Sequence, residues 1–272
     1  MDRVRRTCRL RHLSRRTEDA YCHWIRRFIA HHGMRHPDEL DRTHIIAFLS
    51  TLAVERQVSA STQNQALSAL LFLYDHVLQR PPGTLDGAVR ATEPARLPVV
   101  LSRDEVRRLI AALDGTSRLV ATLLYGAGLR LNEALELRVK DLDFDRCQIA
   151  VRQAKGRKDR QTMLPSSAIP AVRAHLERVR ALHAADLKLG FGAVALPDAL
   201  AVKFPGARTS WAWQFVFPAS RRCLDPRTGA QTRWHLHDTA VQRAVADAVR
   251  AAGLTKRASC HTLRHSFATH LL

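Results

Sequence analysis

The sequence has few of the features that hold secreted or membrane proteins together. Its five cysteines are scattered, odd in number and never spaced as C-x-x-C, which argues against a disulfide framework and against structural zinc. No apolar run approaches the length of a membrane span, and the arginine-rich N-terminus lacks the apolar core of a signal peptide. These absences predict a soluble, cytoplasmic protein that has no contact with a membrane.

Acidic residues are also scarce. The 272 residues include 43 Lys+Arg against 25 Asp+Glu, a formal charge of +18, and only six of the basic residues are lysine. Residues 1–90 carry 14 basic and 9 acidic residues, and residues 91–272 carry 29 and 16, so the charge is not confined to a tail. An arginine excess is also typical of GC-rich genomes, but +18 is more than solubility needs, and guanidinium groups match phosphate geometry. We therefore predict a nucleic-acid partner.

The first ninety residues show helical periodicity. Apolar and aromatic residues recur at positions 21, 24, 25 and 28, again between 45 and 52, and from 67 to 78, each set on one helical face. Pro81-Pro82-Gly83 ends the last stripe, and the residues that follow have no sustained period. The pattern predicts a helical domain over residues 1–82. It also predicts a linker over residues 83–99 that lets two domains sit on opposite sides of a ligand.

A second domain is predicted over residues 100–272. It opens with a capping box, Ser102-Arg-Asp-Glu105, and a later helix is stopped by Gly126-Ala127-Gly128. Residues 139–164 read as short strands around the turn A-K-G-R-K-D-R, which predicts a small antiparallel sheet with Lys155 at a hairpin tip. The expected fold class is mainly α with a small antiparallel β-sheet, in which a helical N-terminal domain precedes a mixed α/β domain.

Two basic residues stand out by their position. Arg130 follows the glycine break at the start of a new helix, where free backbone N–H groups and the helix dipole favour an anion. Glu133, three residues on, either orients Arg130 or forms an ordinary surface ion pair with it. Lys155 lies on a basic hairpin that can swing towards a leaving oxygen or a DNA groove, or it is simply part of an exposed polar turn.

A third basic motif, His261-Thr262-Leu263-Arg264-His265, lies close to the last residue of the sequence. At spacings i, i+3 and i+4 the two histidines and Arg264 share one helical face, with Leu263 pointing away. The glutamate of an H-E-x-x-H site is missing and an arginine stands in the motif, so no metal site is predicted. A cation cluster without carboxylates suits a phosphodiester, because arginine binds non-bridging oxygens while histidine and lysine move protons.

Taken in order, these motifs resemble the tyrosine recombinase (phage integrase) family. The matching residues are Arg130 in G-A-G-L-R-L-N-E-A-L-E-L, Lys155 in the hairpin, and His261 and Arg264 in H-T-L-R-H. The resemblance implies a SAM-like core-binding domain and a tyrosine-recombinase catalytic domain that clamp DNA between them, without metal or other cofactor. It also implies that Arg130 and Arg264 stabilise the attacked phosphate, Lys155 protonates the leaving oxygen, and His261 assists proton transfer.

The stretch from about residue 190 to 237 resembles one subfamily in particular. L-P-D-A-L-A-V-K-F-P-G-A-R-T-S-W-A-W-Q-F-V-F-P, with D-P-R-T-G and H-L-H-D after it, looks like the insertion that distinguishes integron integrases. That likeness implies capture of gene cassettes by four protomers, with double-stranded attI-like and folded single-stranded attC-like DNA sites as partners. Trp211, Trp213, Trp234 and His235 become candidates for stacking on unpaired bases, or else they anchor an irregular insertion by hydrophobic contact.

The sequence departs from the family at the nucleophile. The family's tyrosine, which forms a 3′-phosphotyrosyl link, comes after H-x-x-R, but the eight residues after Arg264 contain no tyrosine, and the second family histidine is also absent. Tyr21, Tyr74 and Tyr125 all precede Arg130 and are predicted to be structural. We expect an incomplete recombinase sequence that does not cleave DNA by itself. The alternatives are a short att-binding repressor, a chain that receives its tyrosine from a full-length partner, and a type IB topoisomerase, which fits the insertion poorly.

Overall fold

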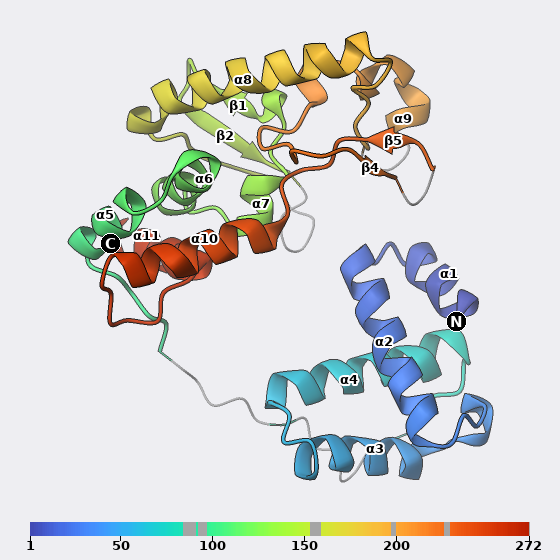
Figure 1. Ribbon diagram of the computed structural model, residues 1–272. Coiled ribbons are helices and arrows are strands. Elements are labelled where there is room, and N and C mark those ends of the chain that lie inside the picture. The colour runs from blue at the N-terminus through green and yellow to red at the C-terminus, as the bar shows by residue number, and fades with distance from the viewer. Residues whose placement is uncertain (84–90, 92–96, 153–158, 197–199, 226–228, 272) are drawn as a thin grey trace. The chain divides into compact units, whose positions relative to one another are not determined.

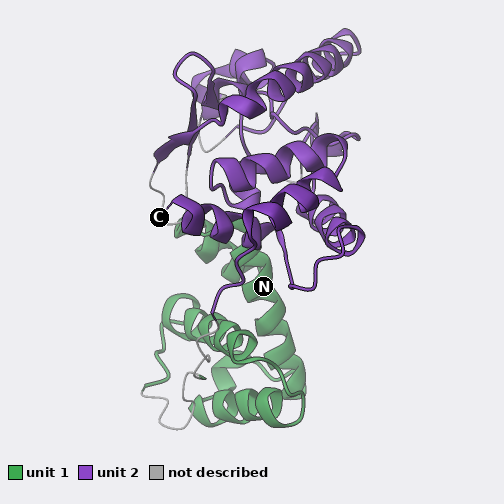
Figure 2. Cartoon of the chain, turned by 90° about the vertical axis from the view of Figure 1, so that its left-hand side faces the viewer, with its two compact units in different colours: residues 1–96 green, residues 97–272 purple. Residues whose placement is uncertain are grey.

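The computed structural model describes residues 1–83, 91, 97–152, 159–196, 200–225 and 229–271. The chain forms two compact units, residues 1–96 and residues 97–272 (Figure 2). Each unit buries an apolar core of its own. The two units are therefore described separately.

Unit 1 consists of helices and turns in its described part. Its elements are α1 (Asp2–Leu10), α2 (Arg15–His31), the 3₁₀ turn η1 (Pro37–Glu39), α3 (Arg42–Val54), α4 (Ala60–Phe72) and the π-turn η2 (Leu73–Val77) (Figure 1). The three apolar stripes of the sequence form its core, in which Phe28, Ile45 and Leu70 are fully buried. The third stripe is not one continuous α-helix, because the backbone changes to a π-turn at Leu73.

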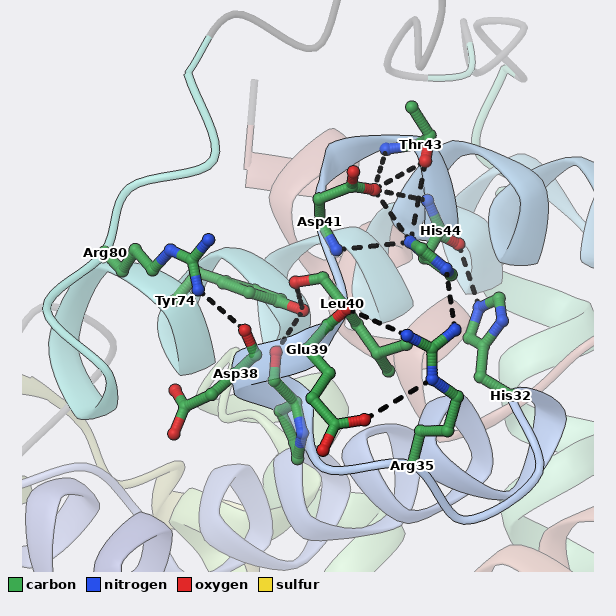
Figure 3. A network of polar contacts seen from close by, with 11 residues as sticks. His32, Arg35, Asp38, Glu39, Leu40, Asp41, Thr43, His44, Tyr74 and Arg80 are labelled. Atoms are coloured by element: carbon green, nitrogen blue, oxygen red, sulfur yellow. Dashed lines mark hydrogen bonds and ion pairs between the residues drawn. The ribbon is translucent and has the colours of Figure 1, made fainter.

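A loop before α3 joins the helices of unit 1 (Figure 3). The buried hydroxyl of Tyr74 lies 3.1 Å from the Pro37 carbonyl oxygen and 2.9 Å from the Leu40 carbonyl oxygen. Burial raises the pKa of Tyr74 to about 12, so the hydroxyl stays protonated and donates. At the end of the loop, Asp41 caps α3 by accepting the backbone N–H groups of Thr43 and His44. Tyr74 is therefore a structural residue of this unit.

Unit 2 is arranged around the apolar helix α6 (Gly115–Gly126). It packs against α5 (Arg103–Ala111), α7 (Leu131–Leu135), α8 (Ile169–Lys188), α10 (Asp238–Ala251) and α11 (Cys260–Leu271). The unit also contains the short helix α9 (Leu200–Lys203). Short 3₁₀ turns lie between them: η3 (Val139–Asp141), η4 (Ser166–Ala168), η5 (Pro205–Arg208) and η6 (Trp211–Trp213). The capping box predicted for the start of α5 is present, since the Glu105 carboxylate accepts from Ser102 N at 2.7 Å and Ser102 Oγ accepts from Glu105 N at 3.1 Å.

Three short strands follow α7. β1 (Leu142–Asp143), β2 (Gln148–Val151) and β3 (Arg160–Met163) form an antiparallel sheet in the order β1-β2-β3. Ile149 and Val151 of β2 are buried in the core, and the register pairs Val151 with Arg160. The register therefore places Arg160 at the end of the sheet next to residues 153–158, which lie outside the described residues.

The insertion predicted over residues 190–237 contains α9, η5, η6 and a two-stranded sheet of β4 (Cys223–Leu224) and β5 (Gln231–Thr232). Arg233 fastens it to α8 through two hydrogen bonds to the Asp186 carboxylate, at 2.6 Å and 2.9 Å. Both side chains are almost fully buried. A paired, buried arginine thus holds a segment that has little regular backbone pairing.

The predicted fold class, mainly α with small antiparallel sheets, is confirmed. The predicted linker, residues 83–99, falls largely on residues outside the described ones, so the limits of 82 and 100 for the two domains stay predictions. No helix in the described part of the chain is long and apolar enough to cross a membrane.

Tyr74→Phe should lower the free energy of unfolding by about 1–3 kcal/mol, because the buried Pro37 and Leu40 carbonyls lose their donor. Urea denaturation followed by circular dichroism measures the change. Tyr21→Phe is the matched control, since the Tyr21 hydroxyl has no hydrogen bond to the described residues and its removal should cost less than about 0.5 kcal/mol. Equal losses in the two variants would show that the Tyr74 hydrogen bonds contribute nothing.

Candidate active site

Arg130 lies at the N-cap of α7 and not within the helix. Its backbone is extended, with φ −74° and ψ 154°. Two residues earlier, Gly128 has φ +62°, and a Cβ at this position would clash with the ring of Phe267 on α11. The glycine turn therefore lets the chain pass close to α11 just before Arg130. Because α7 has only five residues, the helix dipole expected at Arg130 is small.

Glu133 is the acceptor on which the arginines converge. Its Oε1 accepts from Arg130 Nη1 at 2.6 Å and from Arg160 Nη1 at 2.9 Å. Its Oε2 accepts from the Arg130 backbone N–H at 2.8 Å and from Arg160 Nη2 at 2.6 Å, and it lies 3.5 Å from Arg264 Nη1. Burial favours the neutral acid, but the donors of Arg160 and Arg130 outweigh burial and lower the pKa of Glu133 to about 2. Glu133 is therefore a carboxylate at neutral pH.

Arg264 reaches the same place from α11. Its guanidinium donates to the Gly128 carbonyl oxygen and faces the Glu133 carboxylate. Burial and then the nearby charge of Arg130 lower the pKa of Arg264, but a guanidinium group stays protonated at neutral pH. Three arginines around one carboxylate leave two positive charges in excess within this cluster.

His261 lies one helical turn before Arg264 on α11. Its ring centroid is 4.2 Å from that of His265, with the ring planes at 77°. Burial lowers the pKa of His261, and the charges of His265, Arg264 and Arg130 lower it further. His261 is therefore a neutral imidazole at pH 7 that can accept a proton. Leu263, expected to point away from this face, is fully buried in the core.

Lys155 lies outside the described residues, and its catalytic role stays a prediction. The same hairpin contributes Arg160, which the sequence did not single out although it binds Glu133 through two N–H groups. The available signal was its position at the end of the basic sequence K-G-R-K-D-R, where strand β3 begins. Spacing alone does not show which basic residue of such a turn faces inwards.

The expectation of a cluster without carboxylates is wrong, because Glu133 lies among the arginines. The physical reason is that guanidinium groups this close repel one another unless an anion separates them. The side chain of Arg130 is still 40% exposed, which leaves it accessible to a second anion. The arrangement can bind a phosphate while His261 moves a proton. Within the described ranges, no group of three or more His, Cys, Asp or Glu side chains could hold a metal ion.

The four candidate stacking residues lie in the insertion, in different surroundings. The ring centroid of Trp211 is 5.0 Å from Arg180 Cζ and 6.1 Å from the His183 ring, both on α8, which is the setting of an anchor. The Trp213 ring has Lys140 Nζ at 4.0 Å from its centroid, so one of its faces carries a cation.

Trp234 and His235 follow β5 and contact each other, with ring centroids 5.2 Å apart. Both rings pack against buried Phe215, at 5.6 Å and 5.3 Å. Burial lowers the pKa of His235, which is neutral at pH 7. Trp234 is 43% exposed, whereas the other three candidates are half-buried. The stacking role of all four residues stays a prediction.

Both units match families of known proteins. Residues 1–84 match the phage integrase N-terminal SAM-like domain, and residues 99–272 match the phage integrase family. The chain therefore belongs to the phage integrase family of tyrosine-type site-specific recombinases.

Individual relatives agree with this assignment. An integrase/recombinase of Escherichia coli is 52% identical over 272 residues, covering 100% of this chain and 81% of that protein. The tyrosine recombinase XerA of Thermococcus onnurineus is 29% identical over 261 residues, covering 93% of this chain and 73% of that protein. A lambda integrase tetramer bound to a Holliday junction shares the fold with a TM-score of 0.58 at 16% identity, covering 98% of this chain and 67% of that chain.

Glu133→Gln should lower the free energy of unfolding by about 1–3 kcal/mol at neutral pH, because an amide cannot balance three guanidinium groups. The loss stays below that of a fully buried pair, since Arg130 and Arg160 are partly exposed. The Glu133 carboxylate stabilises the fold above its usual pKa of 4.5, and this contribution is lost as the pH falls towards about 2. The difference between variant and wild type should therefore shrink near about pH 3.

Urea denaturation at the two pH values measures both effects. Asp104→Asn is the control, because Asp104 pairs with Arg107 and Arg108 on an exposed surface and should change little. A Glu133→Gln protein as stable as wild type at neutral pH would contradict the central role of this carboxylate.

Proposed function

We propose that this chain carries out site-specific DNA recombination of the integron type, integrating and excising DNA segments at att sites. The observation that carries the proposal is the convergence of Arg130 and Arg264 on Glu133, with His261 on the same helix as Arg264. Membership of the phage integrase family supports recombination as the reaction. The formal charge of +18 supports DNA as the partner.

In the proposed reaction, a tyrosine oxygen attacks a DNA phosphorus atom and the bond to the 5′-oxygen breaks. Negative charge grows on the non-bridging oxygens, to which Arg130 and Arg264 donate hydrogen bonds. His261 accepts the proton of the tyrosine hydroxyl, and Lys155 gives a proton to the leaving 5′-oxygen. The products are a 3′-phosphotyrosyl link and a free 5′-hydroxyl, and the reverse steps on another strand complete the exchange.

The attacking tyrosine is not one of the three in this sequence. Tyr21 and Tyr74 lie in unit 1, where both pack against the apolar core. The Tyr125 hydroxyl lies 2.9 Å from His270 Nδ1, which is roughly 13 Å along α11 from His261. Residues 1–272 therefore bind and orient DNA, and cleavage needs a tyrosine from elsewhere. The positions of these three tyrosines also favour a second candidate function, an att-binding repressor that does not cut DNA.

The insertion suits DNA with unpaired bases. A folded single-stranded attC-like site presents such bases, whereas an attI-like site is fully double-stranded. Trp213, Trp234 and His235 offer aromatic surfaces, and stacking on one base contributes ~1–3 kcal/mol. The proposal also includes four protomers that act together on the DNA. The fold shared with a tetrameric lambda integrase on a Holliday junction supports such an assembly.

Replacing single phosphates of a folded attC-like strand by neutral methylphosphonates should reveal one position where affinity falls roughly ten-fold. Arg130 and Arg264 both face that phosphate in the proposed site, so Arg264→Ala should weaken binding to unmodified DNA and should reduce the sensitivity at that position to the part that Arg130 still contributes. Gel-shift titrations measure both. Arg250→Ala is the control, because Arg250 pairs with Asp247 on the exposed surface of α10. A scan without any position that depends on Arg264 would contradict the phosphate-binding cluster.

A suicide substrate should give no covalent protein–DNA adduct with this chain alone, because Tyr21 and Tyr74 pack in the core of unit 1 and the Tyr125 hydroxyl contacts His270. Denaturing gels detect such adducts, and the 52% identical Escherichia coli relative provides a comparison. An adduct that disappears in Tyr125→Phe would show that this side chain leaves His270 and attacks the DNA.

A further inference from the structure

Arg138 joins the segment that carries Glu133 to the insertion that carries the candidate stacking residues. We propose that Arg138 is a positioning residue that holds these aromatic side chains and thereby sets the preference for DNA with unpaired bases. The inference rests on the proposed function, since it concerns the folded single-stranded partner.

The guanidinium of Arg138 makes three contacts with the insertion. Its Nη1 donates to the Trp213 carbonyl oxygen at 2.8 Å, and its Nη2 donates to the Ala195 carbonyl oxygen at 2.9 Å. Its Cζ lies over the Phe215 ring, 3.6 Å from the ring centroid, which is a cation–π contact. One side chain thus fixes two separate stretches of an irregular segment.

The backbone beside Arg138 strengthens this attachment. Arg138 forms an antiparallel bridge with Phe215, and the flanking bonds run from Val139 N to the Gln214 carbonyl at 3.0 Å and from Val216 N to the Leu137 carbonyl at 2.8 Å. These bonds keep the chain around Trp213 alongside the segment that begins at α7.

The candidate stacking residues Trp213, Trp234 and His235 depend on this junction. Trp234 and His235 pack against Phe215, whose ring Arg138 covers. Trp213 is held through its carbonyl by Arg138, and its ring lies under Lys140, two residues further on. Removing the Arg138 guanidinium therefore removes one support of these aromatic groups while leaving every aromatic side chain in place.

The same segment is tied to the catalytic cluster. Arg138 follows Glu133 by five residues, and its backbone N–H donates to Asp141 Oδ2 at 3.0 Å. Asp141 Oδ1 also accepts from Arg152 Nε at 2.9 Å, and Arg152 is the last described residue before the segment in which the sequence predicts the turn with Lys155. Burial lowers the pKa of Arg138 to about 10, so it remains charged at neutral pH. The aromatic groups thus have a fixed place relative to the phosphate-binding arginines.

Two DNA hairpins of equal length test the inference, one with bulged thymines and one fully paired. Wild-type protein should bind the bulged hairpin more tightly. Arg138→Met should weaken binding to the bulged hairpin roughly ten-fold, a loss comparable to one stacking contact, and should change binding to the paired hairpin less than about two-fold. Arg138→Lys keeps the charge but not the planar fork, so it should lie between the two.

The control is Arg173→Met on α8. Arg173 Cζ lies 4.3 Å from the centroid of the Phe144 ring, so this substitution removes the same charge and the same kind of ring contact elsewhere in the unit. Combining Arg138→Met with Trp213→Ala should cost no more than the larger single loss, as expected for residues that act through one another. Fluorescence anisotropy measures all affinities.

Three results would overturn the inference, and they differ in meaning. Equal losses on both hairpins would mean that Arg138 only supports the fold. A full preference retained in Arg138→Met and Arg138→Lys would mean that the aromatic groups are held without it. No preference in the wild-type protein would remove the folded-strand part of the proposed function, and the role of Arg138 with it.

Discussion

The Glu133 carboxylate accepts hydrogen bonds from Arg130 and Arg160 and faces Arg264, and the arginine cluster of unit 2 depends on this one buried anion. It connects the start of α7, strand β3 and helix α11, which are distant in sequence. Without it, three guanidinium groups at this separation would repel one another and the segments would move apart. Because one carboxylate balances only part of their charge, the cluster keeps an electrostatic preference for a further anion. The charges that stabilise the unit are therefore the same ones that bind phosphate in the proposed function.

Local features of this site could be predicted from the sequence, and convergent ones could not. The glycine break before Arg130 and the spacing of His261 and Arg264 are properties of neighbouring residues, which periodicity and turn chemistry describe. Arg160 was missed because its partner lies 27 residues earlier in the chain, where spacing carries no information. The apolar stripe from residue 67 to 78 predicted a helix but not the π-turn at Leu73, because either backbone buries the same face.

The insertion shows how irregular chain can be held without long strands or helices. Gln214 donates to the carbonyl oxygens of Gly192 and Ser210, and the His183 ring lies 3.0 Å from the Thr209 carbonyl oxygen. Side chains thus satisfy backbone groups that a sheet would otherwise pair. Because side chains hold the insertion together, only some of its aromatic residues are left to contact a ligand. Trp211 packs against α8, while Trp234 is 43% exposed.

Gly128 has a consequence for the spacing of Arg130 and Arg264. Its single hydrogen atom lets the Phe267 ring, and with it α11, approach the chain just before Arg130. The gap between Arg130 and Arg264 is thus set by the absence of a methyl group. A recombinase can lose activity although every catalytic side chain is present, if the segments that carry two of them are held slightly too far apart. The backbone, as much as the arginines, sets the size of the anion that fits.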